Sequence, residues 1–213
     1  MQYRKIGKTD MKASVIGMGA EHLDNKPYEL VEETIHAALE KQINIMDLFM
    51  PGEEVRQNIG KALKGRRNDM LIQGHIGSVD LNQQYDISRD LSVCQKYFEN
   101  LLRDLKTDYI DFGMLFFIDS EEDFNRVFHG DILTYAQKLK KQGTIRAIGA
   151  SSHNPEIAKK VVESGEVELL MFSINPAFDR MNTEYELEAL FEDSFQKEKG
   201  HGINPGRTEL YRL

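Results

Sequence analysis

The sequence contains a single cysteine, Cys94, among its 213 residues. Because a disulfide needs two thiols, no intrachain disulfide is expected, and a metal cluster held by several cysteines is excluded as well. We interpret Cys94 as a small buried hydrophobic residue on a helix. This shortage of cysteine favours a reducing compartment, and we expect the protein in the cytoplasm.

Long apolar runs and metal-binding motifs are also missing. No stretch of 18 apolar residues occurs, and the first ten residues, MQYRKIGKTD, lack the apolar segment of a signal peptide. We therefore expect neither a membrane span nor a secretory leader. No HExxH, CxxC or EF-hand pattern is present, so we predict no metal site.

Basic residues are fewer than acidic residues in this chain. Lysine and arginine total 27 against 35 acidic residues, which gives a net charge of -8. A chain this acidic is not expected to bind nucleic acid or an anionic membrane through its bulk charge, although a local basic pocket could still hold an anionic cofactor. Hydrophobic residues make up 40% of the chain, enough for the core of one α/β domain.

What the sequence does contain is a regular alternation of short apolar runs and amphipathic stretches. Residues 2–16 flank a Gly-Lys-Thr turn and predict a β-hairpin. The predicted strands are 15–19, 43–49, 70–74, 109–117, 145–150 and 167–174, and the predicted helices are 27–41, 53–64, 88–105, 121–142 and 155–164. Ser88 is the expected N-cap of its helix. Strands alternating with helices predict a parallel sheet covered by helices.

Periodicity alone leaves two architectures open, a doubly wound open sheet and a closed (β/α)₈ barrel. The first strand is followed by GMGAEH, whose glycines do not have the GxGxxG spacing of a dinucleotide-binding doubly wound domain. The tail contains a helical piece at 184–191, and Asn204-Pro205 is predicted to open a further helix through Tyr211. We expect the chain to stop inside that helix.

Four segments resemble the aldo-keto reductases from Met1 to about Pro176. They are YRKIGKTDMKASVIGMGAEH, INIMDLF followed by EEVRQNIGKALKGRR, LLRDLKTDYIDFGML, and GTIRAIGASSHNP. LMFSINPAFD and the ending GINPGRTELYRL resemble the branch that carries a C-terminal iron–sulfur cluster. The cysteines of that cluster would lie beyond Leu213, so it is expected only in a longer chain.

The resemblance implies an α/β fold, a (β/α)₈ TIM barrel with NADP(H) at its C-terminal mouth. Residues 1–213 would form one incomplete barrel domain with an N-terminal β-hairpin and about six βα units, truncated after the sixth strand and its following helical segment. The first and sixth strands would then be open edges, which a homo-oligomer could cover.

The resemblance also suggests the catalytic residues. Asp47, after the second strand, matches the family aspartate, although it could instead cap a helix or form a loop ion pair. The family tyrosine has no counterpart near Met50, the family lysine is replaced by His75, and the family histidine by Phe116. His75 could donate a proton near neutral pH, or it could merely hydrogen bond a backbone carbonyl.

For the cofactor, the resemblance implies Gly19, Asp47, Ser151, Ser152 and Asn175. Ser151 matches the family serine that binds the carboxamide, whereas Ser152 replaces an asparagine. Hydroxyl groups can both donate to and accept from an amide. The alternative is local: Ser152 suits a helix N-cap, and Asn175 precedes proline and suits a turn.

Three functions remain open. The first is an oxidoreductase that transfers a hydride from NAD(P)H to a small-molecule carbonyl. The second is a catalytically inactive barrel relative that acts as a binding or interaction module, favoured by the missing tyrosine, lysine and histidine. The third is a fragment of a longer oxidoreductase with no function of its own. The sequence does not identify the substrate or distinguish NADPH from NADH.

Overall fold

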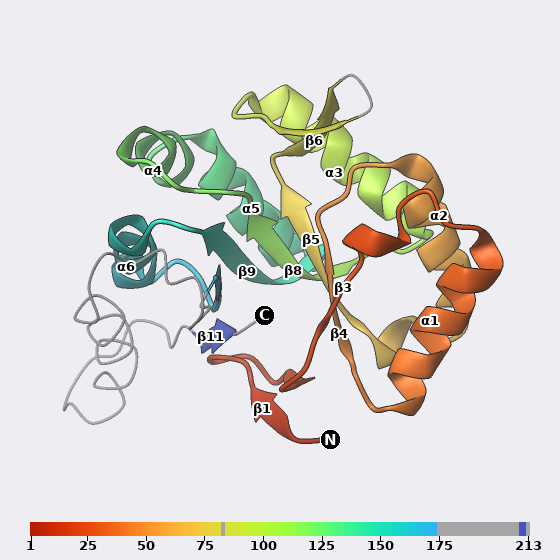
Figure 1. Ribbon diagram of the computed structural model, residues 1–213. Helices are drawn as coiled ribbons and strands as arrows, with labels where there is room; N and C mark the ends of the chain where they lie inside the picture. Colours follow the sequence, from red (N-terminus) through yellow and green to blue (C-terminus); the bar gives the residue numbers. More distant parts are fainter. Residues whose placement is uncertain (82–83, 174–208, 212–213) are drawn as a thin grey trace.

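The computed structural model describes residues 1–81, 84–173 and 209–211. Within them, one curled parallel sheet has the strand order β11-β10-β9-β8-β5-β4-β3. Its strands are β3 Met18–Gly19, β4 Ile45–Leu48, β5 Leu71–Ile76, β8 Ile110–Leu115, β9 Ile145–Ser152, β10 Leu169–Phe172 and β11 Glu209–Tyr211. The expected incomplete barrel is confirmed (Figure 1).

Helices cover the outer face of this sheet (Figure 1). They are α1 Tyr28–Glu40, α2 Glu53–Ala62, α3 Leu91–Leu105, α4 Glu121–Phe128, α5 Asp131–Gln142 and α6 Pro155–Ser164, with 3₁₀ turns η1 Glu21–Leu23 and η2 Arg67–Asp69. Two antiparallel hairpins stand outside the sheet. They are formed by β1 Tyr3–Lys5 with β2 Lys12–Ser14, and by β6 Ser78–Leu81 with β7 Gln84–Ile87.

Side chains along each strand alternate between the helices and the barrel interior. Met46 and Leu48 of β4 pack in the large cluster under the helices, so Ile45 and Asp47 point inward. Ile45 joins a second cluster that contains the hairpin residue Ile6. The N-terminal hairpin therefore fills the interior at the amino ends of the strands and leaves the carboxyl ends open.

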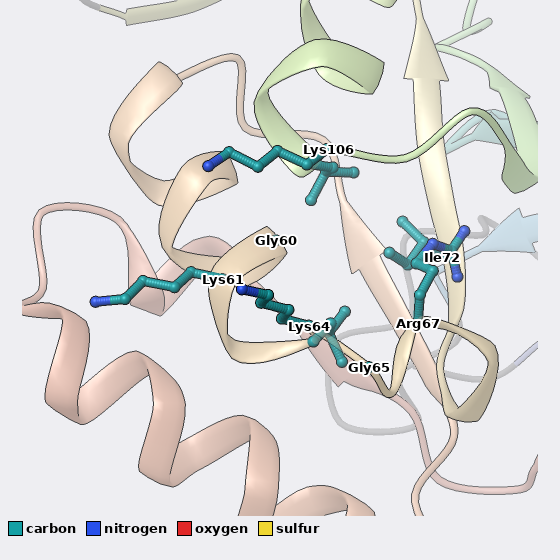
Figure 2. A pocket seen from close by; sticks show the side chains of 9 residues that line it. Gly60, Lys61, Lys64, Gly65, Arg67, Ile72 and Lys106 are labelled. Atoms are coloured by element: carbon teal, nitrogen blue, oxygen red, sulfur yellow. The ribbon is translucent and has the colours of Figure 1, made fainter.

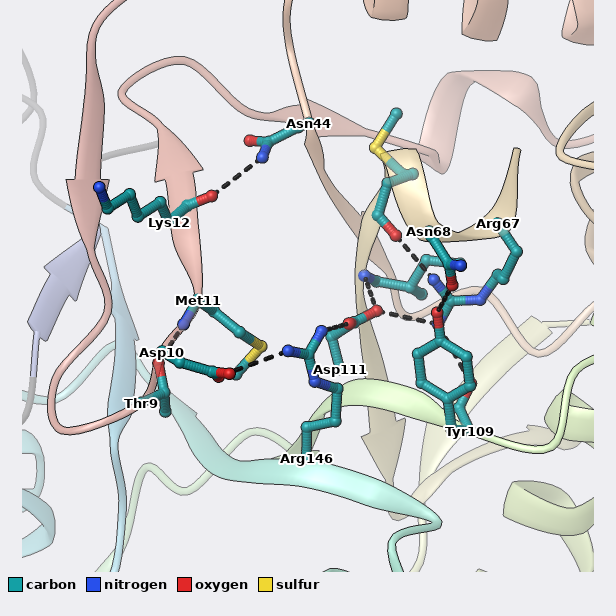
Figure 3. A network of polar contacts seen from close by, with 12 residues as sticks. Thr9, Asp10, Met11, Lys12, Asn44, Arg67, Asn68, Tyr109, Asp111 and Arg146 are labelled. Atoms are coloured by element: carbon teal, nitrogen blue, oxygen red, sulfur yellow. Dashed lines mark hydrogen bonds and ion pairs between the residues drawn. The ribbon is translucent and has the colours of Figure 1, made fainter.

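A buried carboxylate ties the strands together at their amino ends. Asp111, only 1% exposed, accepts hydrogen bonds from the Ile72 backbone and from Arg67 and Arg146, each at 2.9 Å. Arg146 also reaches Asp10 of the N-terminal hairpin at 3.4 Å (Figure 3). A buried carboxylate needs this many partners to offset its desolvation.

Helices α2 and α3 approach each other closely at a glycine of α2, Gly60. A Cβ on Gly60 would lie 2.5 Å from the carbonyl oxygen of Leu105 at the end of α3. Figure 2 shows Gly60 beside Lys106, which follows that end and adopts a left-handed conformation with φ of 53°. The contact is with backbone, so the two helices would have to separate to admit a methyl group.

Several predicted boundaries were wrong for local reasons. The predicted helix 121–142 is two helices, because Gly130 is extended and its Cα lies so close to the Arg126 carbonyl that a Cβ there would be 2.3 Å from that oxygen. The N-cap of α3 is Asp90 rather than Ser88, since the Asp90 carboxylate accepts from the Val93 backbone at 3.0 Å. The predicted strand 15–19 is only Met18–Gly19, with Ile16 exposed.

Two further differences concern strands that the sequence did not predict. Residues 209–211 form a strand parallel to β10, whereas a helix was predicted there. The prediction was wrong because so short a segment has no periodicity that distinguishes a strand from a helix. Consequently, β10 is not an edge there. The β6–β7 hairpin was missed because its strands are short. The predicted helix 184–191 lies outside the described residues.

We predict that Gly60→Ala destabilises the protein by about 1–3 kcal/mol, because overpacking outweighs the better helix propensity of alanine. Gly19→Ala is the matched control, since nothing lies within 4 Å of a Cβ there. Urea unfolding followed by circular dichroism measures both variants. Equal stability of Gly60→Ala and the wild type would contradict the close helix approach.

Candidate functional site

A cavity of about 510 Å³ opens at the carboxyl ends of the strands. Its walls come from β3, β4, β9 and β10, from the segments that follow β3, β4, β8 and β9, and from the β6–β7 hairpin. The lining residues are Gly17, Gly19, Glu21, His22, Asp47, Phe49, Tyr85, Phe116, Phe117, Ser151, His153 and Met171. Active sites of (β/α)₈ barrels lie at this end, which makes the cavity the candidate site.

Three of the expected residues, Asp47, Phe116 and Ser151, lie on the inner side at or near the carboxyl ends of their strands. Asp47 pairs with Gln73 across β4 and β5, and Ser151 pairs with Met171 across β9 and β10. Phe116 directly follows β8 and, by the register of Leu115 with Ala150, stands opposite Ser151. All of these side chains have the inward parity, so they form a ring around the inner end of the cavity.

Asp47 is bound to His75 at the base of the cavity. Nε2 of His75 lies 2.7 Å from Oδ1 of Asp47, and both side chains are at least 90% buried. Asp47 lines the cavity, whereas His75 is not among the lining residues. His75 Nδ1 has no partner among the described residues. His75 has the inward parity of Gln73 and lies beside Asp47 in the barrel interior, but its side chain is fully buried and exposes no surface to the cavity.

Aromatic rings form one wall. Phe49 stacks on Phe116 at a centroid distance of 6.0 Å and meets Tyr85 edge-on at 5.1 Å. The edge of the His75 ring meets Phe116 at 5.0 Å. These contacts place an aromatic wall beside the Asp47–His75 pair, to which the β6–β7 hairpin contributes Tyr85.

Ser151 lines the cavity with its hydroxyl already fixed. Its Oγ accepts a hydrogen bond from the Phe117 backbone at 2.8 Å, and its carbonyl accepts one from Ile118 at 2.8 Å. Phe117 adopts a left-handed conformation with φ of 56°, and its carbonyl accepts from Arg89 at 2.9 Å. The Ser151 hydroxyl proton remains available to donate to a ligand, since Oγ acts only as an acceptor in these contacts.

Beside Ser151, a second histidine–aspartate pair reaches the cavity. Nδ1 of His153 lies 3.0 Å from Oδ2 of Asp119, and the His153 backbone donates to Oδ1 of the same carboxylate at 2.5 Å. The His153 ring lines the cavity and is 32% exposed. Burial raises the pKa of Asp119, but hydrogen bonds from His153 and Ser152 lower it more, so this pKa lies below its ordinary value.

The structure separates the residues that the sequence singled out. Gly19, Asp47 and Ser151 line the cavity. His75 is buried beside Asp47, and Ser152 is turned away, with its hydroxyl 3.2 Å from Asp119 Oδ1. Asn175 lies outside the described residues.

Sequence reasoning missed Tyr85, Asp119 and His153. For His153, the available signal was an imidazole directly after a predicted strand and two serines. Nothing in the sequence paired it with Asp119, which lies 34 residues away and follows a different strand. Tyr85 depended on recognition of the short β6–β7 hairpin.

A second cavity, of about 490 Å³, lies near the amino end of β5 and carries positive charge (Figure 2). Two of its cations are already engaged. Lys61 sits over the Tyr28 ring with its Nζ 3.3 Å from the centroid, and Arg67 binds Asp111. This cavity is remote from the ring of inward side chains, and we do not place the candidate site there.

The described part of the chain contains neither a candidate membrane span nor a candidate metal-binding cluster. None of the described helices is both long and apolar enough to cross a membrane. No group of three or more histidine, cysteine, aspartate or glutamate side chains in that part of the chain is arranged to hold a metal ion.

Comparison with known proteins identifies the family. Residues 15–194 match the profile of the Aldo/keto reductase family, and the chain belongs to that family. It is 26% identical over 190 residues to the uncharacterized oxidoreductase YqkF of Bacillus subtilis, an alignment that covers 87% of this chain and 60% of YqkF.

The fold of the chain also matches solved structures of aldo-keto reductases. The holo form of aldo-keto reductase AKR11C1 from Bacillus halodurans matches with a TM-score of 0.70 and 26% identity, over 82% of this chain and 58% of that protein. An aldo/keto reductase from Klebsiella pneumoniae, in complex with NADP and acetate, matches in fold with a TM-score of 0.59 and 16% identity, over 75% of this chain and 54% of that one. The chain thus spans about 60% of the length of YqkF and of AKR11C1.

We predict energetic coupling between Asp47 and His75. Asp47→Ala should cost about 2–3 kcal/mol, because it leaves both ring nitrogens of His75 buried without a partner. Adding His75→Phe should then cost less than it does in the wild type, with a coupling energy of about 1–2 kcal/mol. Urea unfolding of the four proteins in this cycle measures the coupling, and strictly additive changes would contradict the hydrogen bond.

We also predict that Asp119 makes stability depend on pH. A carboxyl whose pKa is lowered by folding stabilises the protein above its unfolded pKa of about 4 and loses that effect as pH falls through the lowered value. Asp119→Asn should lower the melting temperature by about 2–4 °C at pH 7, the shift that 1 kcal/mol produces in a domain of this size.

The measurement is a series of melts from pH 7 to pH 3. The difference between Asp119→Asn and the wild type should shrink toward pH 3, whereas the exposed control Asp108→Asn should differ little at any pH. A difference that stays constant down to pH 3 would contradict the ionised role of Asp119.

Proposed function

We propose that the chain carries the nicotinamide end of an oxidoreductase site, at which a small-molecule carbonyl is reduced with NAD(P)H. The observation that carries this proposal is the presence of Asp47 and Ser151 in the lining of one cavity at the carboxyl ends of the strands. The holo form of the Bacillus halodurans relative and the NADP complex of the Klebsiella protein support it.

The chemistry of the cavity fits a nicotinamide ring. The free hydroxyl proton of Ser151 can donate to a carboxamide oxygen, and the Phe117 backbone holds that hydroxyl in place. The aromatic wall of Phe49 and Phe116 offers a flat apolar surface. A volume of about 510 Å³ lies in the range of small-molecule sites.

The cavity offers few groups that could bind the phosphates of a dinucleotide. Among the described residues that line the cavity there is no lysine or arginine. We therefore propose that these residues bind the nicotinamide end, and that the phosphates and adenine depend on other segments. Affinity of the chain for the whole cofactor is then expected to be modest.

A bound nicotinamide cofactor would supply the hydride. The chain itself would orient the ring through Ser151 and present the Asp47 carboxylate to the reacting centre. His75 acts on this proposal as a positioning residue, because its Nε2 holds Asp47 at 2.7 Å and its side chain exposes no surface to the cavity. This role differs from the proton donation that its place in the sequence suggested.

One observation favours the alternative of an inactive binding module. Phe116 occupies the cavity wall where the family histidine is expected, and its ring is packed between Phe49 and His75. An apolar ring cannot orient a carbonyl oxygen by hydrogen bonding. An apolar wall at Phe116 is therefore what we would expect of a protein that keeps the cavity for binding but no longer reduces a carbonyl.

We predict that NADPH or NADH binds the purified chain and raises its stability, by about 2.7 kcal/mol at a concentration one hundred times Kd. Ser151→Ala should weaken binding about 2–10-fold, as expected for the loss of one hydrogen bond between uncharged groups. Ser164→Ala, at the far end of α6, is the matched control and should leave Kd unchanged.

Fluorescence titration of the nicotinamide and thermal melts on the same samples provide the readout. Cooperative melting without binding of either cofactor would contradict the proposal and favour the interaction module. The absence of cooperative melting would favour the reading of the chain as a fragment without independent function.

A further inference from the structure

The groups that could give a proton to a substrate in the cavity form a short series. His75 is buried beside Asp47 and does not line the cavity. The described lining contains three histidine or tyrosine side chains that could donate a proton, which are His22, Tyr85 and His153. Of these, His153 is held by a hydrogen bond to a carboxylate. The side chains of His22 and Tyr85 make no hydrogen bond to any described residue, so their orientation is not fixed in the same way.

The setting of His153 is built by several independent contacts. Asp119 binds both the ring and the backbone of His153, and Asn154 donates its side-chain amide to the Asp119 carbonyl at 3.1 Å. The Phe117 ring lies against the imidazole at a centroid distance of 4.4 Å. Phe117 keeps its left-handed backbone because Ser151 and Arg89 bind its amide and carbonyl.

We propose that His153, oriented by Asp119, is the residue that transfers the proton to the carbonyl oxygen of the substrate; this inference rests on the proposed oxidoreductase function. With Nδ1–H bound to Asp119, the other ring nitrogen, Nε2, is the one available to a ligand. His153 follows Ser151 by two residues and lines the same cavity, so the proton donor and the proposed carboxamide partner both lie at the carboxyl end of β9.

The proposed transfer delivers a hydride to carbon and a proton to oxygen of the same carbonyl bond. In the reduction, the carbonyl carbon gains a hydride from the nicotinamide, and the electron pair of the C=O π bond moves to oxygen. The oxygen takes the proton from Nε2 of the imidazolium, so an O–H bond forms and an N–H bond breaks. The products are an alcohol, the oxidised cofactor and neutral His153, which recovers its proton from water.

The charges around the ring favour this role. Asp119 stabilises the imidazolium directly. Arg89 lies beyond Phe117 and is neutralised by Asp123 at 2.9 Å. Two further carboxylates, Glu21 of η1 and Asp47 of β4, line the same cavity, together with the side chains of His22 and Tyr85.

The first test measures the tautomer and needs no cofactor. In ¹⁵N-labelled protein at high pH, the neutral ring of His153 should carry its proton on Nδ1, and Asp119→Asn should release this preference. His153→Gln assigns the signals by their loss. A proton found on Nε2 in the neutral wild-type ring would overturn the proposal, because Asp119 would then not be holding the Nδ1–H group.

The second test uses turnover of aliphatic and aromatic aldehydes and ketones with NADPH. His153→Gln should lower turnover about 10²–10⁴-fold, the usual effect of removing a positioned acid, while NADPH affinity changes less than about threefold. His129→Gln is the matched control. Its Nδ1 is likewise bound, to Asn125 at 3.0 Å, and its ring meets Phe124 edge-on, but it lies on the surface away from the cavity.

The turnover and tautomer measurements distinguish failure of the His153 role from failure of the proposed oxidoreductase function. Wild-type turnover that survives in His153→Gln but is lost in Tyr85→Phe would overturn the role of His153 and assign the proton to the phenol. If the wild type neither binds NADPH nor turns over a carbonyl, the proposed function and the transfer step both fail. Loss of turnover in His153→Gln and retention in His129→Gln, with Nδ1–H in the tautomer measurement, would support the proposal.

Discussion

The parallel alignment of the strands is the constraint on which the rest of this molecule depends. Because β3, β4, β5, β8, β9 and β10 run in one direction, their carboxyl ends meet at one rim, and every loop that follows a strand faces the same space. Residues as distant in sequence as Asp47 and Ser151 become neighbours of one cavity for this reason alone. The amino ends, by contrast, are closed by the N-terminal hairpin and by the carboxylate of Asp111.

The two buried aspartates illustrate what each end requires. Asp111 receives two arginines and a backbone amide, so its charge is balanced and its position is fixed. Asp47 receives one imidazole nitrogen and leaves its remaining capacity toward the cavity. A structural carboxylate is surrounded by partners, whereas one that is to act on a ligand must keep part of its surface free, at some expense in stability.

The sequence predicted most of the architecture because that information is local. Apolar periodicity located the strands and helices, and glycine marked the ends of α5 and α6, where Gly143 and Gly165 are left-handed. It failed at two local features that apolar periodicity does not mark, which are the break at Gly130, close to the Arg126 carbonyl, and the short strands of the β6–β7 hairpin. The site divided in the same way. Asp47 lies near the carboxyl end of a predicted strand and Ser151 directly follows another, whereas the pairing of His153 with Asp119 joins two loops and leaves no pattern in either.

The position of the titratable groups suggests how a barrel of this family can change its polar residues. Inside the sheet, a histidine must find partners for both nitrogens, and His75 already leaves Nδ1 without one among the described residues; apolar Phe116 at the next strand avoids that penalty. A loop histidine such as His153 is partly solvated, so one carboxylate suffices to orient it and water can accept or return its proton. If His153 donates the proton as proposed, a loop position keeps a donor at the cavity, while apolar Phe116 places no unsatisfied polar group in the interior. The apolar wall at Phe116 and the Asp119–His153 pair would then be complementary parts of one site.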